Sequence, residues 1–273
     1  MKKGDSSVVD APLVTVITVV YNNVKHIRGA LESVISQDYE RIEYVVIDGG
    51  SSDGTQGIIE EYKDRIDVYI SEPDEGIYDA LNKGIVNSTG EVIGILHSDD
   101  LFCDESVVSD CIALMQQKGT EFCFSDMVIV NQQLDKIIRY YKASYFSQWM
   151  FRIGWLPPHP TVFLNRELFD QFGLYSIKYK AAGDFEFFVR VFYGKKIAYS
   201  YLDRVTVMMR SGGTSNSGVS SKLLVANEID MALRENNVFS HSLIQIFRYI
   251  LRMFEFILKP NKKRFQLKKS ETR

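Results

Sequence analysis

The feature that most constrains the fold is a regular alternation of short apolar runs and predicted helices over the first 100 residues. The apolar runs contain few polar residues, and they span residues 13–20, 42–47, 66–70 and 91–96. The helices predicted between them cover about 23–37, 54–62 and 76–87. Strands that are apolar throughout are typical of a parallel sheet that helices cover on both faces. The sequence therefore predicts an α/β fold around such a sheet.

Each predicted strand ends in a polar or glycine-rich turn. The turns are YNN (21–23), DGGSSDGT (48–55), SEPDEG (71–76) and HSDD (97–100). Turns that follow the carboxyl ends of parallel strands lie along one edge of the sheet, where α/β proteins bind ligands. We therefore expect four polar clusters to converge on one crevice.

Two adjacent carboxylates, Asp99 and Asp100, stand in the last of these turns. Like charges this close repel each other, so a positive charge or good solvation is expected beside them. Carboxylates at a strand end can bind Mg²⁺ or Mn²⁺ together with substrate phosphates. The alternative is that Asp100 caps the helix predicted near 104–118.

Two further aspartates lie in the turn after the second strand. Asp48 precedes Gly49 and Gly50, which allow close backbone approach, and an aspartate at this position can accept hydrogen bonds from a base or ribose. Asp53 is better explained by an Asx-type turn that starts the following helix.

After Leu101 the order of the predicted elements changes. Strand-like runs cover 121–130, 136–141, 197–201 and 204–209. Helices are predicted near 104–118, 183–193, 218–236 and 241–258. The chain has no internal repeat or clear linker, and 273 residues with 45% hydrophobic content can bury a sizeable core.

Composition excludes several classes of protein. A net charge of −3 gives no indication of a nucleic-acid partner. Three cysteines without a CxxC pair argue against a disulfide framework or zinc site and suit a reducing cytosol. No apolar run reaches the ~18 residues that a membrane span needs. The N-terminal segment does not resemble a signal peptide, so we expect a cytoplasmic protein.

The C-terminal segment differs from the rest of the chain in charge. Residues 241–273 contain nine basic and two acidic residues, a net charge of +7, whereas the remainder has a net charge of −10. Apolar residues recur there at helical spacing, at Ile244, Phe247, Leu251, Phe254 and Leu258. Such a basic helix favours an anionic membrane surface. The alternative is a helix packed on the body with a solvated basic end.

Three longer segments carry a family resemblance. They are VTVITVVYNN…DGGSSDGT, SEPDEGIYDALNKGIVNSTGEVIGILHSDD and PPHPTVFLNRELFDQFGLY…YKAAGDFEFFVRV. Over about residues 12–215 the chain resembles family 2 glycosyltransferases of the GT-A fold, especially bacterial O-antigen and capsule polysaccharide enzymes. The resemblance implies a Rossmann-like mixed sheet flanked by helices. The expected domain covers 1–215, with a nucleotide-binding half (12–100) and an acceptor half (101–215), before a C-terminal helical extension with a basic tail (216–273).

The resemblance also implies a function. A family member of this kind inverts the anomeric carbon while it moves a sugar from a nucleotide diphosphate, most often UDP, to a hydroxyl. The acceptor would be a lipid-linked or growing surface glycan, so the enzyme would work in the cytoplasm, peripherally at the inner face of the cell membrane. A divalent cation, Mn²⁺ or Mg²⁺, would neutralise the departing diphosphate.

Individual residues then acquire expected roles. By the resemblance, Thr18, Tyr21 and Asp48 would hold the nucleotide, with Asp48 reaching its base. Further residues that we expect at the nucleotide sugar are Tyr78, Asp79, Asn82, Ser98, Asp99 and His159. The expected metal ligands are His97, Asp99 and Asp100, with Asp99 as the acid of the family's DxD motif. Asp184 would be the catalytic base, because an attacking hydroxyl needs a carboxylate within hydrogen-bond reach.

Several of these residues have alternative explanations. For His159 in LPPHP, packing within a rigid loop is about as good an explanation as contact with the nucleotide sugar. Glu186 lies two positions after Asp184 on the predicted helix, so it faces elsewhere, towards solvent or Arg190 at i+4. GGTS (212–215) would be a mobile loop over the diphosphate or a simple connection.

The chain departs from the family pattern at two positions. Gly49 replaces one acid of the usual DDGS, and His97 replaces the first aspartate of DxD. Histidine can bind Mn²⁺ but suits Mg²⁺ poorly. These departures motivate an alternative function, a catalytically weak sugar-nucleotide-binding scaffold at the membrane surface.

Overall fold

The computed structural model describes residues 11–212, 219–258, 260 and 265. Its first half contains the predicted parallel strands, which are β1 (Val14–Val20), β2 (Ile42–Asp48), β3 (Val68–Ser71) and β4 (Val92–Ile95). The pairs β3–β2, β2–β1 and β1–β4 are all parallel. The helices between these strands are α1 (Ile27–Ile35), α2 (Thr55–Glu60) and α3 (Ile77–Val86), with the 3₁₀ turn η1 (Lys63–Arg65) before β3. The predicted α/β fold is confirmed.

The second half makes the sheet mixed. Its strands are β5 (Asp100–Phe102), β6 (Phe122–Val130), β7 (Ile137–Tyr141), β8 (Phe163–Asn165) and β9 (Tyr199–Arg210). In the described residues the sheet order is β3-β2-β1-β4-β8-β6-β9-β5. β7 lies outside this order and pairs with the second half of β6, at residues 127–130. The two runs predicted at 197–201 and 204–209 are one strand, β9, whose register against β6 shifts beside Ser125 and Asp126.

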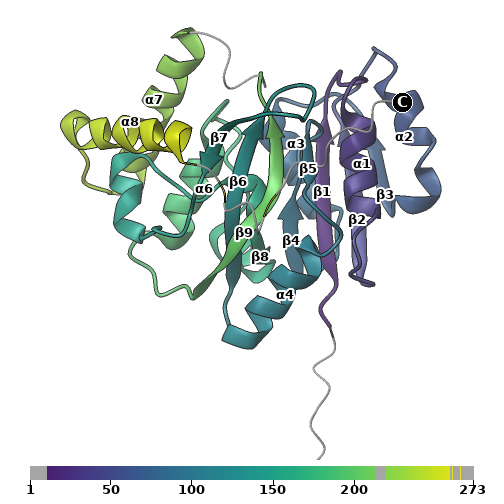
Figure 1. Cartoon of the computed structure of the whole chain (residues 1–273), viewed down its shortest axis with the longest axis horizontal. Coiled ribbons are helices and arrows are strands. Elements are labelled where there is room, and N and C mark those ends of the chain that lie inside the picture. The colour runs from purple at the N-terminus through teal and green to yellow at the C-terminus, as the bar shows by residue number, and fades with distance from the viewer. Residues whose placement is uncertain (1–10, 213–218, 259, 261–264, 266–273) are drawn as a thin grey trace, which may run out of the picture.

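Helices cover both faces of the sheet (Figure 1). On β1, Val14 and Val16 pack with α1 and α4 (Val107–Lys118), whereas Ile17 and Val19 pack with α3 and α6 (Gly183–Phe192) on the other side. Because both faces of the strand are buried, its sequence is apolar throughout.

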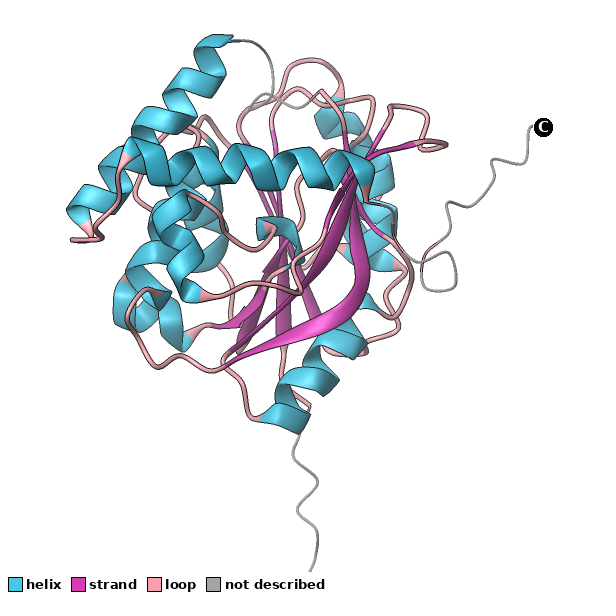
Figure 2. Cartoon of the chain, turned by 60° about the vertical axis from the view of Figure 1, so that its left-hand side comes forward, coloured by secondary structure: helices cyan, strands magenta, loops and turns pink. Residues whose placement is uncertain are grey.

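The remaining elements complete the second half. They are η2 (Gln148–Ile153), η3 (His159–Thr161), α5 (Glu167–Phe172), α7 (Val219–Glu235) and α8 (Ser242–Ile257). α7 packs on α6, and α8 packs on β7 and η2. Figure 1 shows α7 and α8 together on the side of the molecule away from α2 and β3, and Figure 2 turns this side towards the viewer. Among the described residues, we find no helix whose length and apolar content would suit it to crossing a membrane.

Candidate active site

The polar turns at the carboxyl ends of the parallel strands lie together, as predicted. The Asn23 side-chain amide donates to the Ser98 hydroxyl (2.8 Å), which joins the turns after β1 and β4. The Asn22 backbone N–H donates to the Ser51 hydroxyl (2.8 Å), which joins the turns after β1 and β2. The Glu72 N–H donates to the Asp48 carbonyl (3.0 Å), which adds the turn after β3. The four turns therefore form one connected rim.

Two of the residues expected at the nucleotide lie inside this rim instead of on it. Thr18 is fully buried, with its hydroxyl oxygen 3.1 Å from the Tyr44 hydroxyl. Asp48 is also fully buried. Its carboxylate accepts hydrogen bonds from the Ser71 hydroxyl (2.6 Å), the Gln56 amide (3.1 Å) and the Ser51 N–H (3.1 Å). Asp48 therefore fixes the shape of its turn.

Tyr21 and Asp53 complete these two turns. Tyr21 follows β1 and is 66% exposed, so its ring is available at the rim. Asp53 forms the predicted Asx-type turn, since its carboxylate accepts the Thr55 N–H (3.0 Å). A second hydrogen bond, from the Val24 N–H (3.0 Å), ties Asp53 to the segment after β1.

The adjacent acids Asp99 and Asp100 have very different environments. Asp99 is partly exposed, whereas Asp100 is fully buried as the first residue of β5. The suggestion that Asp100 caps a helix is wrong, because β5 intervenes and α4 begins only at Val107. Burial, and then the charge of Asp99, raises the pKa of Asp100 well above its usual range, and Arg210 acts in the opposite direction.

Arg210 is the positive charge that the acid pair requires. It is the last residue of β9, which pairs with β5 through Asp100 and Met209. Both Asp99 and Asp100 raise the pKa of Arg210, but burial has the larger effect and lowers it. This charge interaction cannot be predicted from the sequence, because it depends on pairing between strands that lie far apart in the chain.

His97 and His159 lie close together beside Asp99. Their ring centroids are 6.0 Å apart. Burial, and then the nearby His159, lowers the pKa of His97 to about 4, so this imidazole is neutral at pH 7. Its Nδ1 atom is buried and has no hydrogen-bond partner in the described part of the chain. Within the same residues, no group of three or more His, Cys, Asp or Glu side chains forms a metal-binding cluster.

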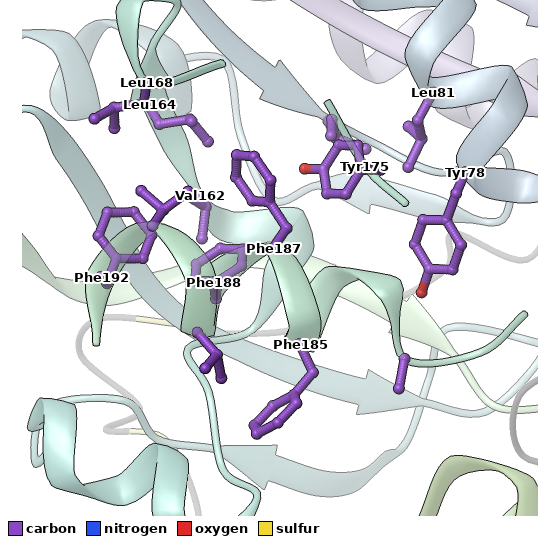
Figure 3. Packing of buried hydrophobic residues seen from close by; sticks show 14 of the residues in the cluster. Tyr78, Leu81, Val162, Leu164, Leu168, Tyr175, Phe185, Phe187, Phe188 and Phe192 are labelled. Atoms are coloured by element: carbon purple, nitrogen blue, oxygen red, sulfur yellow. The ribbon is translucent and has the colours of Figure 1, made fainter. Parts of the chain in front are cut away.

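Asp184 lies in the first turn of α6. Its carboxylate accepts hydrogen bonds from the Phe185 N–H (2.8 Å) and the Tyr78 hydroxyl (3.3 Å). Burial raises the pKa of Asp184. Tyr78 extends from α3 towards the start of α6 (Figure 3), and its ring lies 2.8 Å from where a Cβ on Gly183 would stand. α3 and α6 thus fix Asp184 through this close tyrosine–glycine contact.

The comparisons with known proteins identify the family. The model of "Glycosyl transferase family 2" matches residues 15–181. The chain belongs to glycosyltransferase family 2. An uncharacterized glycosyltransferase of Mycobacterium tuberculosis is 33% identical over 185 residues, which cover 66% of this chain and 69% of the relative. A PGL/p-HBAD biosynthesis glycosyltransferase of Mycobacterium bovis is 24% identical over 219 residues, covering 78% of this chain and 83% of the relative.

Solved structures confirm the GT-A fold of this glycosyltransferase. S. aureus TarS 1–349 in complex with UDP-GlcNAc has a TM-score of 0.64 at 21% identity, covering 89% of this chain and 73% of TarS. The mannosyltransferase PcManGT from Pyrobaculum calidifontis, in complex with GDP-Man and Mn²⁺, has a TM-score of 0.60 at 18% identity, covering 82% of this chain and 64% of PcManGT. The predictions of the family, the fold and a transferase activity are thus confirmed.

Two residues expected to contact ligand support the core of the transferase. The Asn82 side chain exchanges hydrogen bonds with the backbone of Tyr175 (2.8 and 2.9 Å). The Tyr175 hydroxyl in turn lies 2.9 Å from Nε2 of His159. His159 is buried, and burial lowers its pKa to about 4. These contacts hold His159 in place beside His97.

The other predicted positions have identified partners. The Asp79 carboxylate accepts the Glu75 N–H (3.1 Å) and lies 3.5 Å from the Lys83 ammonium. Glu186 is buried and forms an ion pair with Arg190 (2.8 Å), as predicted for the acid that does not face the crevice. Of the GGTS segment, residues 213–215 lie outside the described residues.

Proposed function

We propose that this transferase moves a sugar from a nucleotide diphosphate to an acceptor hydroxyl with inversion at the anomeric carbon. The observation that carries the proposal is the position of Asp184, a partly exposed carboxylate at the start of α6 whose charge influences His97 across the site. The acceptor oxygen would attack the anomeric carbon while the bond from that carbon to the diphosphate oxygen breaks. Asp184 would take the hydroxyl proton, and the nucleotide diphosphate would leave with the bonding electrons.

A nucleotide-sugar donor is supported by the ligands named for the structural neighbours, UDP-GlcNAc for TarS and GDP-Man for PcManGT. We assign the donor to the half formed by 12–100, with Tyr21 and the turn shaped by Asp48 at the nucleotide. The residues that we place around the sugar and phosphates are Tyr78, Asp79, Asn82, Ser98, Asp99 and His159. The half formed by 101–215 would bind the acceptor, and 216–273 would be an extension.

A divalent cation, Mn²⁺ or Mg²⁺, fits beside the diphosphate. Asp99 is partly exposed, and His97 presents a neutral imidazole, which suits Mn²⁺ better than Mg²⁺. Asp100 is buried, so of the three predicted ligands it is the least accessible. The cation would neutralise charge on the leaving diphosphate. Two protein ligands agree with an ion shared with the substrate phosphates.

The acceptor that we propose is a lipid-linked or growing surface glycan of the O-antigen or capsule type, met at the inner face of the cell membrane. The arrangement of α8 supports this location. Ile244 and Leu251 pack against the core, whereas Phe247, Phe254 and Leu258 of the same apolar stripe are exposed.

A donor screen tests the proposal. We expect one nucleotide sugar, with UDP-GlcNAc and GDP-mannose as first probes, to stabilise the protein in the presence of Mn²⁺, by about 2.7 kcal/mol at 100 times its Kd. Asp99→Asn should reduce donor hydrolysis or transfer by more than about tenfold without unfolding the protein. Equal activity in chelator and in Mn²⁺ would exclude the metal role. Donor binding without any hydrolysis or transfer would favour the scaffold alternative.

A further inference from the structure

A single glycine separates a carboxylate from an exposed aromatic ring at the nucleotide end of the site. A Cβ on Gly49 would stand 2.3 Å from Oδ2 of Asp74 and 3.3 Å from the ring of Tyr21. The space left by the missing side chain is therefore filled by the Asp74 carboxylate, which belongs to the turn after β3. Tyr21 approaches the same space from the turn after β1, so the carboxylate and the ring are neighbours.

The three segments that bring these groups together are fixed to one another. The Gly49 N–H donates to the Val20 carbonyl (2.9 Å), directly before Tyr21. The Ser71 hydroxyl donates to the Asp48 carboxylate (2.6 Å), and the Glu72 N–H donates to the Asp48 carbonyl (3.0 Å), shortly before Asp74. The pair is therefore positioned before any ligand arrives.

One carboxylate oxygen of Asp74 is available to accept a hydrogen bond from a ligand. Oδ1 accepts the Gly76 N–H (2.9 Å), whereas Oδ2 has no hydrogen-bond partner in the residues that the structure describes. Two neighbouring acids are engaged elsewhere, because Glu72 lies 2.9 Å and Asp79 3.5 Å from the Lys83 ammonium. Asp48, the acid first expected to reach the base, is buried and already accepts three hydrogen bonds.

We propose that Asp74 and Tyr21 recognise the base of the donor nucleotide and that Asp48 positions them. This inference rests on the proposed nucleotide-sugar donor. A planar base can stack on an exposed aromatic ring, and an ionised carboxylate is purely a hydrogen-bond acceptor. The pair therefore selects bases with an N–H on the ring edge, which uracil, thymine and guanine have and cytosine lacks. Gly49 leaves the space that the Asp74 carboxylate occupies.

Calorimetric titration with UDP, GDP and CDP tests this assignment. The wild-type protein should bind UDP or GDP more tightly than CDP, because only the first two offer a ring N–H to Asp74. Asp74→Asn should weaken binding of the preferred nucleotide by about tenfold or more, as expected when a hydrogen bond to a charged group is lost. CDP should bind no worse, because the new amide can donate to the ring nitrogen of cytosine. The preference over CDP should therefore shrink.

Glu75→Gln is the matched control, since Glu75 is an exposed acid one position away, and it should leave both affinities unchanged. If Asp74→Asn leaves the preference over CDP intact, or weakens all nucleotides equally, base recognition by Asp74 is wrong while the donor class stands. If the wild-type protein prefers CDP, the assignment is also wrong. If it binds no nucleoside diphosphate, the proposed donor fails as well.

Discussion

At the scale of single residues, the two acids in the first turn of α6 show how environment separates roles. Glu186 is buried and paired with Arg190, whereas Asp184 is partly exposed and accepts hydrogen bonds from two neutral groups, the Tyr78 hydroxyl and the Phe185 N–H. Asp184→Asn should therefore reduce transfer by about 10²–10⁴-fold, the usual contribution of a general base. Donor affinity, measured by calorimetry, should change by less than about 1 kcal/mol, because the lost interaction belongs to the transition state.

Glu186→Gln is the comparison variant for this prediction. It should retain transfer but unfold at a lower temperature, because Arg190 loses the charge of its buried partner. The opposite pattern, with transfer lost in Glu186→Gln and kept in Asp184→Asn, would move the base to Glu186.

The pH dependence of transfer follows from the same residue. A base acts only when deprotonated, so transfer should be slow below the pKa of Asp184 and rise as the pH passes through it. Burial raises this pKa, so the acidic limb should lie above about 3.9, the ordinary value for aspartate. A kcat profile measured from acidic to neutral pH would show the limb. A limb at or below the ordinary value would contradict the assignment of Asp184 as the base.

At the scale of elements, the sequence predicts what local pattern determines. β1, β2 and β4 are apolar on both faces because both faces are buried. This pattern can be recognised in the sequence alone. The strands β5 and β8 have three residues each, which is too short for a periodic signal, and they were missed. Their absence from the prediction also concealed Arg210, which reaches the acid pair only through the pairing of β5 with β9.

Glycines mark where elements approach each other, but their partners are not evident from sequence. A Cβ on Gly94 of β4 would stand 2.5 Å from the ring of Phe163 on β8, and one on Gly183 would stand 2.8 Å from Tyr78. A glycine within a strand indicates close packing. It does not say which aromatic residue fills the space. The same holds for Gly49 and Asp74, so the candidate site could be located from the sequence while the contacts within it could not.

At the scale of the whole molecule, α8 buries two charged residues, Arg248 and Glu255, while several of its phenylalanines are exposed. Glu255 is buried against the body, with its carboxylate 2.6 Å from the Arg139 guanidinium on β7. Phe247 and Phe254 of the same helix are 58% and 56% exposed. The helix crosses the outside of the molecule (Figure 2), and the sequence from 241 onwards carries a net charge of +7. The packing interpretation is confirmed for one face of α8. The membrane interpretation stays a prediction, which concerns the exposed face.

An exposed apolar face beside a basic segment is suited to an anionic bilayer. We expect the full chain to sediment with phosphatidylglycerol vesicles at low salt and less with phosphatidylcholine vesicles. Burying a phenylalanine side chain contributes about 1.5–3 kcal/mol, so replacing Phe247 and Phe254 together by serine should lower vesicle binding by tenfold or more. Leu223→Ser is the control, because Leu223 is an exposed apolar residue on α7, whose sequence lacks the basic character of the C-terminal segment. Unchanged sedimentation of the double variant would remove α8 from the membrane contact. If the wild-type protein is instead a dimer and the double variant is a monomer, the exposed face of α8 contacts a second copy of the chain.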